Sequence, residues 1–166
     1  MEISLTMMCE EDMDDLFIFE NENRAYFEKT VPPRPEGYYF FDAFKGAMNQ
    51  LLEEQKNHLS YFYIIRNEKS EMAGRINLTD IDLNAGTAQV GYRIGEGFAG
   101  RQVASSALKL LLLEAAAKEI REIQAKTIKE NIASQRVLLR NGFTQIDCDS
   151  DFIFYSYKVI KSFDRE

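Results

Sequence analysis

The sequence predicts an α/β fold with a mixed, mostly antiparallel central sheet flanked by helices. Three observations favour it. Residues 38–57 carry apolar side chains three and four positions apart, residues 59–94 alternate between apolar and polar side chains, and residues 103–119 are apolar on nearly every side. These patterns are typical of an amphipathic helix, of half-buried strands and of a helix buried against a sheet, respectively. A length of 166 residues predicts a single domain spanning 1–166, able to bury a core without metal or disulfide.

The first third of the chain predicts one strand and two helices. Glu2–Met7 alternates like a short strand, and Glu11–Asn21 has its apolar positions on one side of a helix. The Pro-rich segment 31–35 must be irregular, because proline can continue neither a helix nor a β-ladder. After it, Tyr38–Asn57 is predicted as a longer helix.

The middle of the chain predicts an antiparallel meander. Leu59–Arg66, Met72–Ile81 and Thr87–Ile94 are the expected strands, and the polar turns 67–70 and 82–86 connect them. The last third returns to helix and strand in alternation. Its expected elements are the loop Gly95–Arg101, the helix Val103–Glu119, the strand Glu122–Ile128, the helix Asn131–Asn141, and the strands Phe143–Cys148 and Phe152–Val159.

The charge of the chain indicates which kinds of partner it favours. The chain has 20 basic and 27 acidic residues, a net charge of −7, which disfavours binding to nucleic acid and mildly favours cationic substrates. Seven acids near the N-terminus form either a solvated helix face or a field that attracts an amine or a basic peptide. They are Glu10, Glu11, Asp12, Asp14, Asp15, Glu20 and Glu22.

We expect a cytoplasmic protein without a membrane span or a metal centre. No apolar run approaches the roughly 20 residues that a spanning helix needs. No basic segment precedes an apolar one at the N-terminus, so no secretory signal is expected. Cys9 and Cys148 have no metal-binding or redox spacing, and isolated cysteines are typical of a reducing compartment.

The loop Gly95–Gly100 spells G-x-G-x-x-G between a predicted strand and a predicted helix. This context is required for dinucleotide binding, but the strand before it belongs to hairpins, and too few residues follow for a second nucleotide-binding half. More generally, such a loop offers unpaired backbone N–H groups and the positive end of a helix dipole, which suit a phosphate or pyrophosphate. Arg101 adds a cation. A plain turn between strand and helix is the alternative.

A second signal is the start of the helix at Asn131. Asparagine caps the first N–H groups of a helix, and Ser134 lies three residues on, on the same face. Gly142 follows the end of the helix, where glycine is the usual terminator. Alone, this pattern indicates only a well-capped helix, but it follows a pyrophosphate-type loop by some thirty residues.

Together these segments resemble the GCN5-related N-acetyltransferase (GNAT) superfamily, and within it the RimJ/RimL-like, ribosomal-protein alanine N-acetyltransferase type. The resemblance rests on Val90–Ile94, Gly97–Ala104, Ala107–Leu111 and Asn131–Phe143. It implies an N-acetyltransferase that moves an acetyl group from acetyl-CoA directly to a primary amine. No acyl-enzyme forms in this family, so neither cysteine is needed as a nucleophile.

The resemblance also implies a set of cofactor-binding residues. The family loop [Q/R]-x-x-G-x-[G/A], whose backbone amides hold the pyrophosphate, falls on residues 99–104. Here Ala99 replaces the Gln or Arg, and Gln102 replaces the glycine. The Gln102 side chain leaves its amide free if it points away and narrows the pocket if it does not. The implied set is Tyr92, Arg93, Ile94, Ala99, Gly100, Arg101, Gln102, Val103, Ala104, Ser105, Asn131 and Arg136.

Catalytic roles follow from the same resemblance. A backbone N–H in the strand at 92–94 would polarise the acetyl carbonyl, Asn131 would bind the pantetheine arm, and Ser134 would protonate the leaving thiolate. Tyr155 and Tyr157 are rival acids, because other branches use a tyrosine.

The general base and the acceptor stay open. An attacking amine must be neutral, so a base is expected. The candidates are Asp80, Asp82, Asp147, Asp149 and Asp151, each also a plausible turn residue, and His58 near a helix end.

The acceptor expected for this branch is a protein N-terminal α-amine, with a small-molecule amine as the alternative. A homodimer is allowed. Rival functions are a non-catalytic acyl-CoA-binding module, a nicotinamide-dependent oxidoreductase and a purely structural role.

Overall fold

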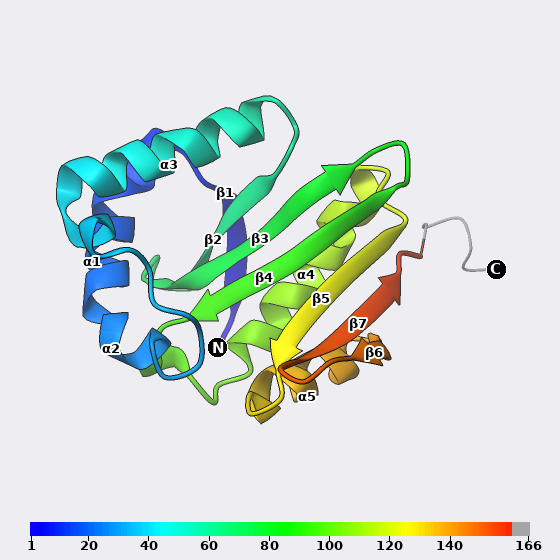
Figure 1. The fold of residues 1–166 in the computed structure, drawn as a ribbon. Coiled ribbons are helices and arrows are strands. Elements are labelled where there is room, and N and C mark those ends of the chain that lie inside the picture. Colours follow the sequence, from blue (N-terminus) through cyan, green and yellow to red (C-terminus); the bar gives the residue numbers. More distant parts are fainter. Residues whose placement is uncertain (161–166) are drawn as a thin grey trace.

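A seven-stranded sheet with the order β1-β2-β3-β4-β5-β7-β6 forms the centre of the computed structural model, which describes residues 1–160 (Figure 1). All neighbouring strands are antiparallel except the pair β4 and β5. The strands are β1 (Ile3–Met7), β2 (Tyr61–Asn67), β3 (Met72–Asp82), β4 (Thr87–Ile94), β5 (Glu122–Ile128), β6 (Thr144–Cys148) and β7 (Phe152–Lys158). The predicted mixed, mostly antiparallel sheet is confirmed. The last six residues of the predicted domain lie outside the described part.

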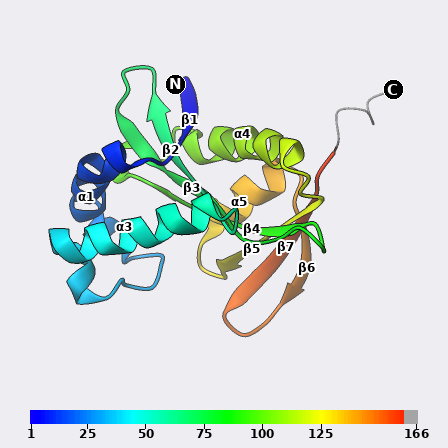
Figure 2. The same cartoon turned by 90° about the horizontal axis from the view of Figure 1, so that it is seen from above.

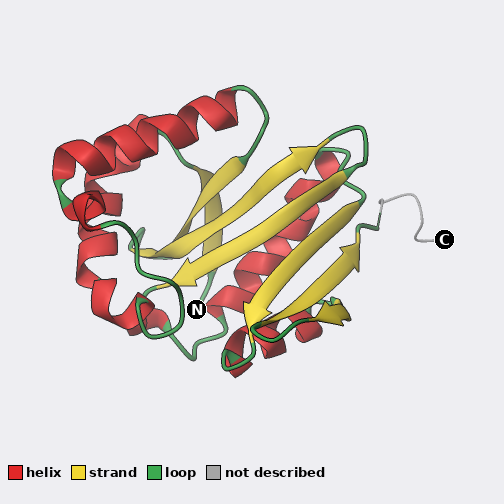
Figure 3. Cartoon of the chain, in the orientation of Figure 1, coloured by secondary structure: helices red, strands yellow, loops and turns green. Residues whose placement is uncertain are grey.

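Helices cover both faces of this sheet (Figures 2 and 3). They are α1 (Met13–Glu22), α2 (Arg24–Phe27), α3 (Phe41–Lys56), α4 (Val103–Ala117) and α5 (Ile132–Arg140). The long predicted helices match α1, α3, α4 and α5 to within a few residues. The short helix α2 and the 3₁₀ turns at 10–12, 36–39 and 96–98 were not predicted, because one turn of helix leaves no periodic pattern.

Two hydrophobic clusters lie on the two faces of the sheet. Strand β2 contributes to both, since its successive side chains point to opposite faces. Tyr63 and Ile65 pack in the cluster that contains α4, whereas Phe62 and Ile64 pack in the cluster formed with α1 and α3. Helix α4 packs only one side against the sheet, through Val103, Ala107, Leu108, Leu111 and Ala115. Its other side is exposed, with Leu113 61% exposed, so the apolar composition overstated how far the helix is buried.

Strands β4 and β5 separate along their length. They pair in parallel only where Thr87–Gln89 lies beside Glu122–Gln124, and the side chains of Gln89 and Gln124 hydrogen-bond at 2.9 Å there. Beyond this point β5 stays paired with β7, and β4 stays paired with β3 up to Ile94. The edge of β4 from residue 90 onward therefore faces an opening in the sheet.

The acidic N-terminal segment is a solvated surface with one exception. Glu10, Glu11 and Asp14 are exposed, and Arg66 forms ion pairs with Asp12 and Asp15 at the β2 side of the molecule. The solvated interpretation is wrong for Glu20, which is fully buried against arginines. Within residues 1–160, no helix is long and apolar enough to cross a membrane.

Candidate active site

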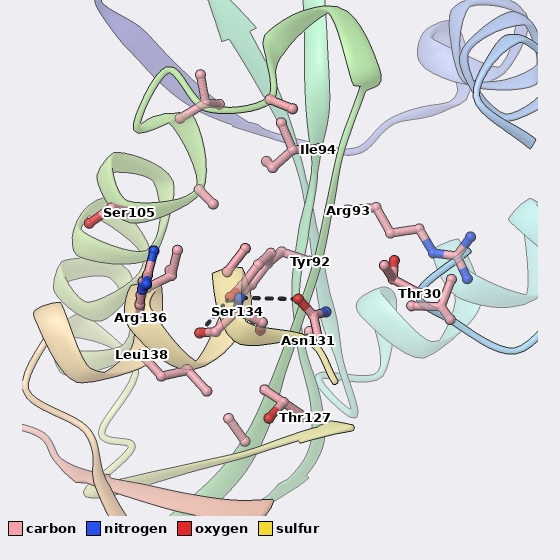
Figure 4. Close-up of a pocket in the computed structure, with 18 of the residues that line it drawn as sticks. Thr30, Tyr92, Arg93, Ile94, Ser105, Thr127, Asn131, Ser134, Arg136 and Leu138 are labelled. Carbon is pink, nitrogen blue, oxygen red and sulfur yellow. Dashed lines mark hydrogen bonds between the residues drawn. The ribbon is translucent and has the colours of Figure 1, made fainter. Parts of the chain in front are cut away.

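A cavity of about 690 Å³ occupies the opening between β4 and β5 (Figure 4). Its walls come from the diverging strands, the loop before α4, the first turns of α5 and residues 26–32. Most of the residues implied by the family resemblance line it: Tyr92, Arg93, Ile94, Ala99, Gly100, Gln102, Val103, Ala104, Ser105, Asn131, Ser134 and Arg136. Arg101 does not line the cavity, and its side chain is exposed.

The N-terminus of α4 presents unpaired donors at this cavity. The first helical bond runs from the Ser106 N–H to the Gln102 carbonyl at 3.0 Å, and no side chain caps the helix within the described residues. The amides of residues 103–105 precede that bond, so they are available to an anion. Arg136 and Arg140 also line the cavity. Donors and cations together fit the phosphates of acetyl-CoA.

The loop before α4 explains why the family carries a glycine where this chain has Gln102. Gln102 has φ = +61° and Gly100 has φ = +73°. This left-handed region is open to glycine and costs other residues energy. The glutamine therefore holds a glycine conformation under strain, and the backbone path of the loop is kept.

Helix α5 begins as the sequence predicts. The Asn131 side-chain oxygen accepts a hydrogen bond from the Ser134 backbone N–H at 3.2 Å, which confirms the predicted cap. Gly142, with φ = +85°, follows the helix end. Capping uses the oxygen of the Asn131 amide, and the amide nitrogen stays available as a donor toward the cavity.

Ser134 is also held by a side chain from the facing strand. The Tyr92 hydroxyl lies 2.8 Å from the Ser134 Oγ (Figure 4). Burial raises the pKa of Tyr92, and the hydrogen bond with Ser134 acts in the opposite direction. Sequence reasoning assigned only backbone contacts to Tyr92. The alternation of β4 does place its side chain on the α5 side of the sheet, but nothing in the sequence pairs it with Ser134.

The rival tyrosines lie apart from this pair. Tyr155 is only 2% exposed and belongs to the hydrophobic cluster that contains residues of α4, opposite Ala125 on β5. Tyr157 packs against the Phe143 ring with centroids 5.3 Å apart. Neither lines the 690 Å³ cavity that contains Ser134, but Tyr155 lines the second cavity, which adjoins the same opening. The acid role of Tyr155 therefore stays a prediction.

A second cavity of about 490 Å³ adjoins the same opening. Its polar side chains include Asn77, Thr79 and Gln89, which alternate to the face away from α4. Both cavities contact Val90, Gly91, Ala125 and Lys126. The opening in the sheet is therefore accessible from both faces near the point where β4 and β5 separate.

Of the five candidate aspartates, only Asp80 lines either of these two cavities. It has φ = +51° in a bulge of β3. Asp82 and Asp149 instead accept backbone N–H bonds in turns. Asp147, on β6, accepts a bond from the backbone N–H of Cys148. His58 bonds Tyr61 at 2.9 Å and lines neither cavity. No cluster of three metal-binding side chains occurs among residues 1–160.

The match to a known domain decides the family. The acetyltransferase (GNAT) domain profile matches residues 2–144. The chain belongs to the GNAT acetyltransferases. It is an acetyl-CoA-dependent N-acetyltransferase. The antiparallel neighbour of β4 also differs from the parallel sheet of dinucleotide-binding folds.

Relatives agree with this assignment. The chain is 28% identical over 127 residues to the ribosomal-protein-serine acetyltransferase of Escherichia coli (strain K12), covering 75% of this chain and 70% of the relative. The fold matches RimL, a ribosomal α-N-protein acetyltransferase solved with coenzyme A, with a TM-score of 0.88, 22% identity and coverage of 95% and 94%. It also matches a ribosomal-protein alanine acetyltransferase from Vibrio fischeri, with a TM-score of 0.86, 18% identity and coverage of 96% and 94%.

Proposed function

We propose that this GNAT enzyme acetylates the α-amine at the N-terminus of a protein. The observation that carries the proposal is the shape of the main cavity, which runs from the N-terminus of α4 through the opening in the sheet to residues Tyr26–Pro32. An extended peptide end can enter the cavity at the end lined by Tyr26–Pro32, which we call the acceptor mouth, while acetyl-CoA occupies the end next to the N-terminus of α4. The name of the E. coli relative, a ribosomal-protein-serine acetyltransferase, supports a protein N-terminus as the acceptor.

The proposed cofactor site is built from both helices and the free edge of β4. Acetyl-CoA supplies the acetyl group as a thioester. The amides at the start of α4 and the guanidinium of Arg136 bind phosphate oxygens, and the Asn131 side-chain nitrogen donates to the pantetheine arm. Backbone N–H groups of β4 between residues 90 and 94, which lack a β5 partner, are the donors that polarise the acetyl carbonyl.

Ser134 is the proposed general acid. As the amine nitrogen bonds to the carbonyl carbon, the carbon–sulfur bond breaks and the sulfur takes a proton from the Ser134 Oγ. A serine alkoxide is costly, and the Tyr92 hydroxyl, 2.8 Å away, is placed to return a proton to it. The pair then acts as a short relay in which Tyr92 positions Ser134 and shares its charge.

Asp80 is the proposed base, acting directly or through water, because it alone of the five aspartates faces the opening. The variant Asp80→Asn should lower kcat, because it removes the carboxylate that takes the proton from the attacking amine. Asp151→Asn, an exposed turn residue of the same charge, is the matched control. Equal kcat in the two variants would remove Asp80 from the mechanism.

Mass spectrometry of peptides incubated with acetyl-CoA tests the acceptor. Peptides beginning with serine or alanine should gain one acetyl group, whereas the same peptides with a blocked N-terminus and one internal lysine should gain none. Acetylation of spermidine or free amino acids in place of peptides would show a small-molecule enzyme instead. Acetyl-CoA binding without turnover on any amine would identify a non-catalytic acyl-CoA-binding module.

We place this activity in the cytoplasm and assign it to the whole chain as one domain. Free, exposed Cys9 and Cys148 support a reducing compartment, where thiols persist. Blue-native electrophoresis and fractionation of the producing cells would check the oligomeric state and the location together.

A further inference from the structure

Three arginines surround one buried carboxylate next to the acceptor mouth of the cavity. The Arg75 Nη1 lies 2.7 Å from the Glu20 Oε1, and the Arg34 Nη2 lies 3.3 Å from the same oxygen. The Arg93 Nη1 approaches the Glu20 Oε2 at 3.8 Å, too far for a hydrogen bond. One negative charge therefore faces three positive charges.

The excess positive charge is partly buried. Glu20 is fully buried and the Arg75 side chain is 5% exposed. The Arg34 Nε is buried without a hydrogen-bond partner. Burial, and next the charge of Arg34, lower the pKa of Arg93, as expected for a cation whose surroundings are short of anions. A further anion placed here would be bound in a site of low dielectric, where charge pairs are strong.

Arg93 is the member of this cluster that reaches the cavity. Because successive strand residues face opposite sides, Tyr92 points toward Ser134 while Arg93 points toward the segment that carries Thr30 (Figure 4). Its guanidinium lies 5.2 Å from the centre of the Phe27 ring, and its side chain is 20% exposed. Phe27 and Thr30 line the same mouth.

The lining of the main cavity contains no carboxylate among the described residues. Its charged side chains are Arg93, Lys126, Arg136 and Arg140. None of the acids near the N-terminus lines this cavity. Asp12 and Asp15 pair with Arg66, and Glu20 pairs with Arg75. The local charge at the acceptor mouth is thus opposite in sign to the net charge of the protein.

We infer an anion subsite at the acceptor mouth, in which Arg93, supported by Arg34 and Arg75, binds a carboxylate carried by the acceptor close to its amine. This inference rests on the proposed acetylation of a protein N-terminus. The matching acceptor is a peptide end with aspartate or glutamate one or two residues after the amine-bearing residue. The subsite disfavours polyamines and basic peptides, which the net charge of −7 would otherwise attract.

Two matched peptides test the subsite, Ser-Glu and Ser-Gln at the start of one otherwise neutral sequence. The ratio of their kcat/KM values cancels general effects on the enzyme. We expect the wild type to prefer the glutamate peptide by about tenfold or more, since a charge-assisted hydrogen bond contributes more than the 1.4 kcal/mol that corresponds to tenfold. In Arg93→Gln the ratio should fall to about one. In Arg66→Gln, which removes the same charge at a site away from the cavity, it should stay at the wild-type value.

A wild-type ratio near one, or an unchanged ratio in Arg93→Gln, would overturn the subsite even if both peptides are acetylated. Calorimetric binding of the two peptides to the wild-type enzyme saturated with coenzyme A separates this result from failure of the proposed function. A glutamate preference in binding without any acetylation would uphold the subsite and reject the activity. The comparison of the two peptides on the wild-type enzyme needs no variant. It therefore tests the subsite even if Arg93→Gln does not fold.

Discussion

Arg75 on β3 and Arg93 on β4 are direct cross-strand partners, and the carboxylate of Glu20 lies between them. Like charges directly opposite one another destabilise a sheet, so the carboxylate from α1 makes this pairing tolerable. The contact ties the N-terminal helices to the sheet beside the acceptor mouth. Burial acts to raise the pKa of Glu20, but the charges of Arg75 and Arg34 outweigh it, and the net effect is a lowered pKa.

Glu20→Gln should lower the free energy of unfolding by about 3 kcal/mol at neutral pH, because it leaves buried arginines without a counter-charge. Urea denaturation measures this, with the exposed Glu22→Gln as the control. Because the pKa of Glu20 is lowered from its ordinary 4.5, its stabilisation is present above that pH and is lost as the pH falls further. The difference between wild type and variant should therefore shrink in acid. A difference that is small at neutral pH would show that Glu20 does not hold the cluster.

Gln102→Gly should raise the free energy of unfolding by about 1 kcal/mol, because it relieves a left-handed backbone at φ = +61°. Gln135→Gly, the same substitution inside α5, should lower stability by about 1 kcal/mol. Thermal denaturation of both variants gives the comparison. Loss of stability in Gln102→Gly would mean that the glutamine side chain stabilises the loop more than its backbone strains it.

Two substitutions separate the capping and cofactor roles of Asn131. Asn131→Ala should lower stability by about 1 kcal/mol through loss of the cap and should weaken acetyl-CoA binding. Asn131→Asp keeps an oxygen for the cap and removes the side-chain N–H donor, so stability should persist while binding weakens. Denaturation and calorimetry on both variants measure the two roles. If acetyl-CoA binds Asn131→Asp as well as the wild type, the residue is only a cap.

Ser134→Ala should lower kcat by about 100-fold, the range of a lost general acid, with little change in the KM for acetyl-CoA. Tyr92→Phe should lower kcat by a smaller factor, because Ser134 keeps its own proton but loses its partner. Ser106→Ala, an exposed serine on α4, is the control. Steady-state kinetics with a serine-terminated peptide provides the measurement, and a wild-type kcat in Ser134→Ala would exclude the acid role.

The sequence predicted most of what depends on neighbours along the chain. Hydrophobic periodicity located the long helices and the strands, and the Asn131 cap and the Gly142 terminator followed from local geometry. The family resemblance directed attention to residues 92–105 and 131–136, and most of the residues it implied line one cavity. These features share one property, since each is defined within a single element or loop.

Contacts between distant elements were not predictable in the same way. Glu20 was grouped with solvated acids because its partner Arg75 lies 55 residues away. Tyr92 and Ser134 are 42 residues apart, and their hydroxyls meet only because the fold brings the first turn of α5 beside β4. Asp80 and Asp82 lie two residues apart, and the sequence does not distinguish them. A bulge in β3 separates their surroundings, so that Asp80 lines the second cavity and Asp82 accepts backbone bonds in a turn.

The most direct test of the account is a calorimetric titration of the protein with acetyl-CoA, repeated on two variants. The wild type should bind at one site. Ala104→Asp places a carboxylate among the amides at the start of α4, where it favours the helix but repels the pyrophosphate, so binding should be lost while the protein stays folded. Ser106→Asp puts the same charge in the same turn on an exposed side outside the cavity lining, and binding should remain. Absence of binding in the wild type, or equal binding in all three proteins, would contradict the placement of acetyl-CoA between β4, α4 and α5.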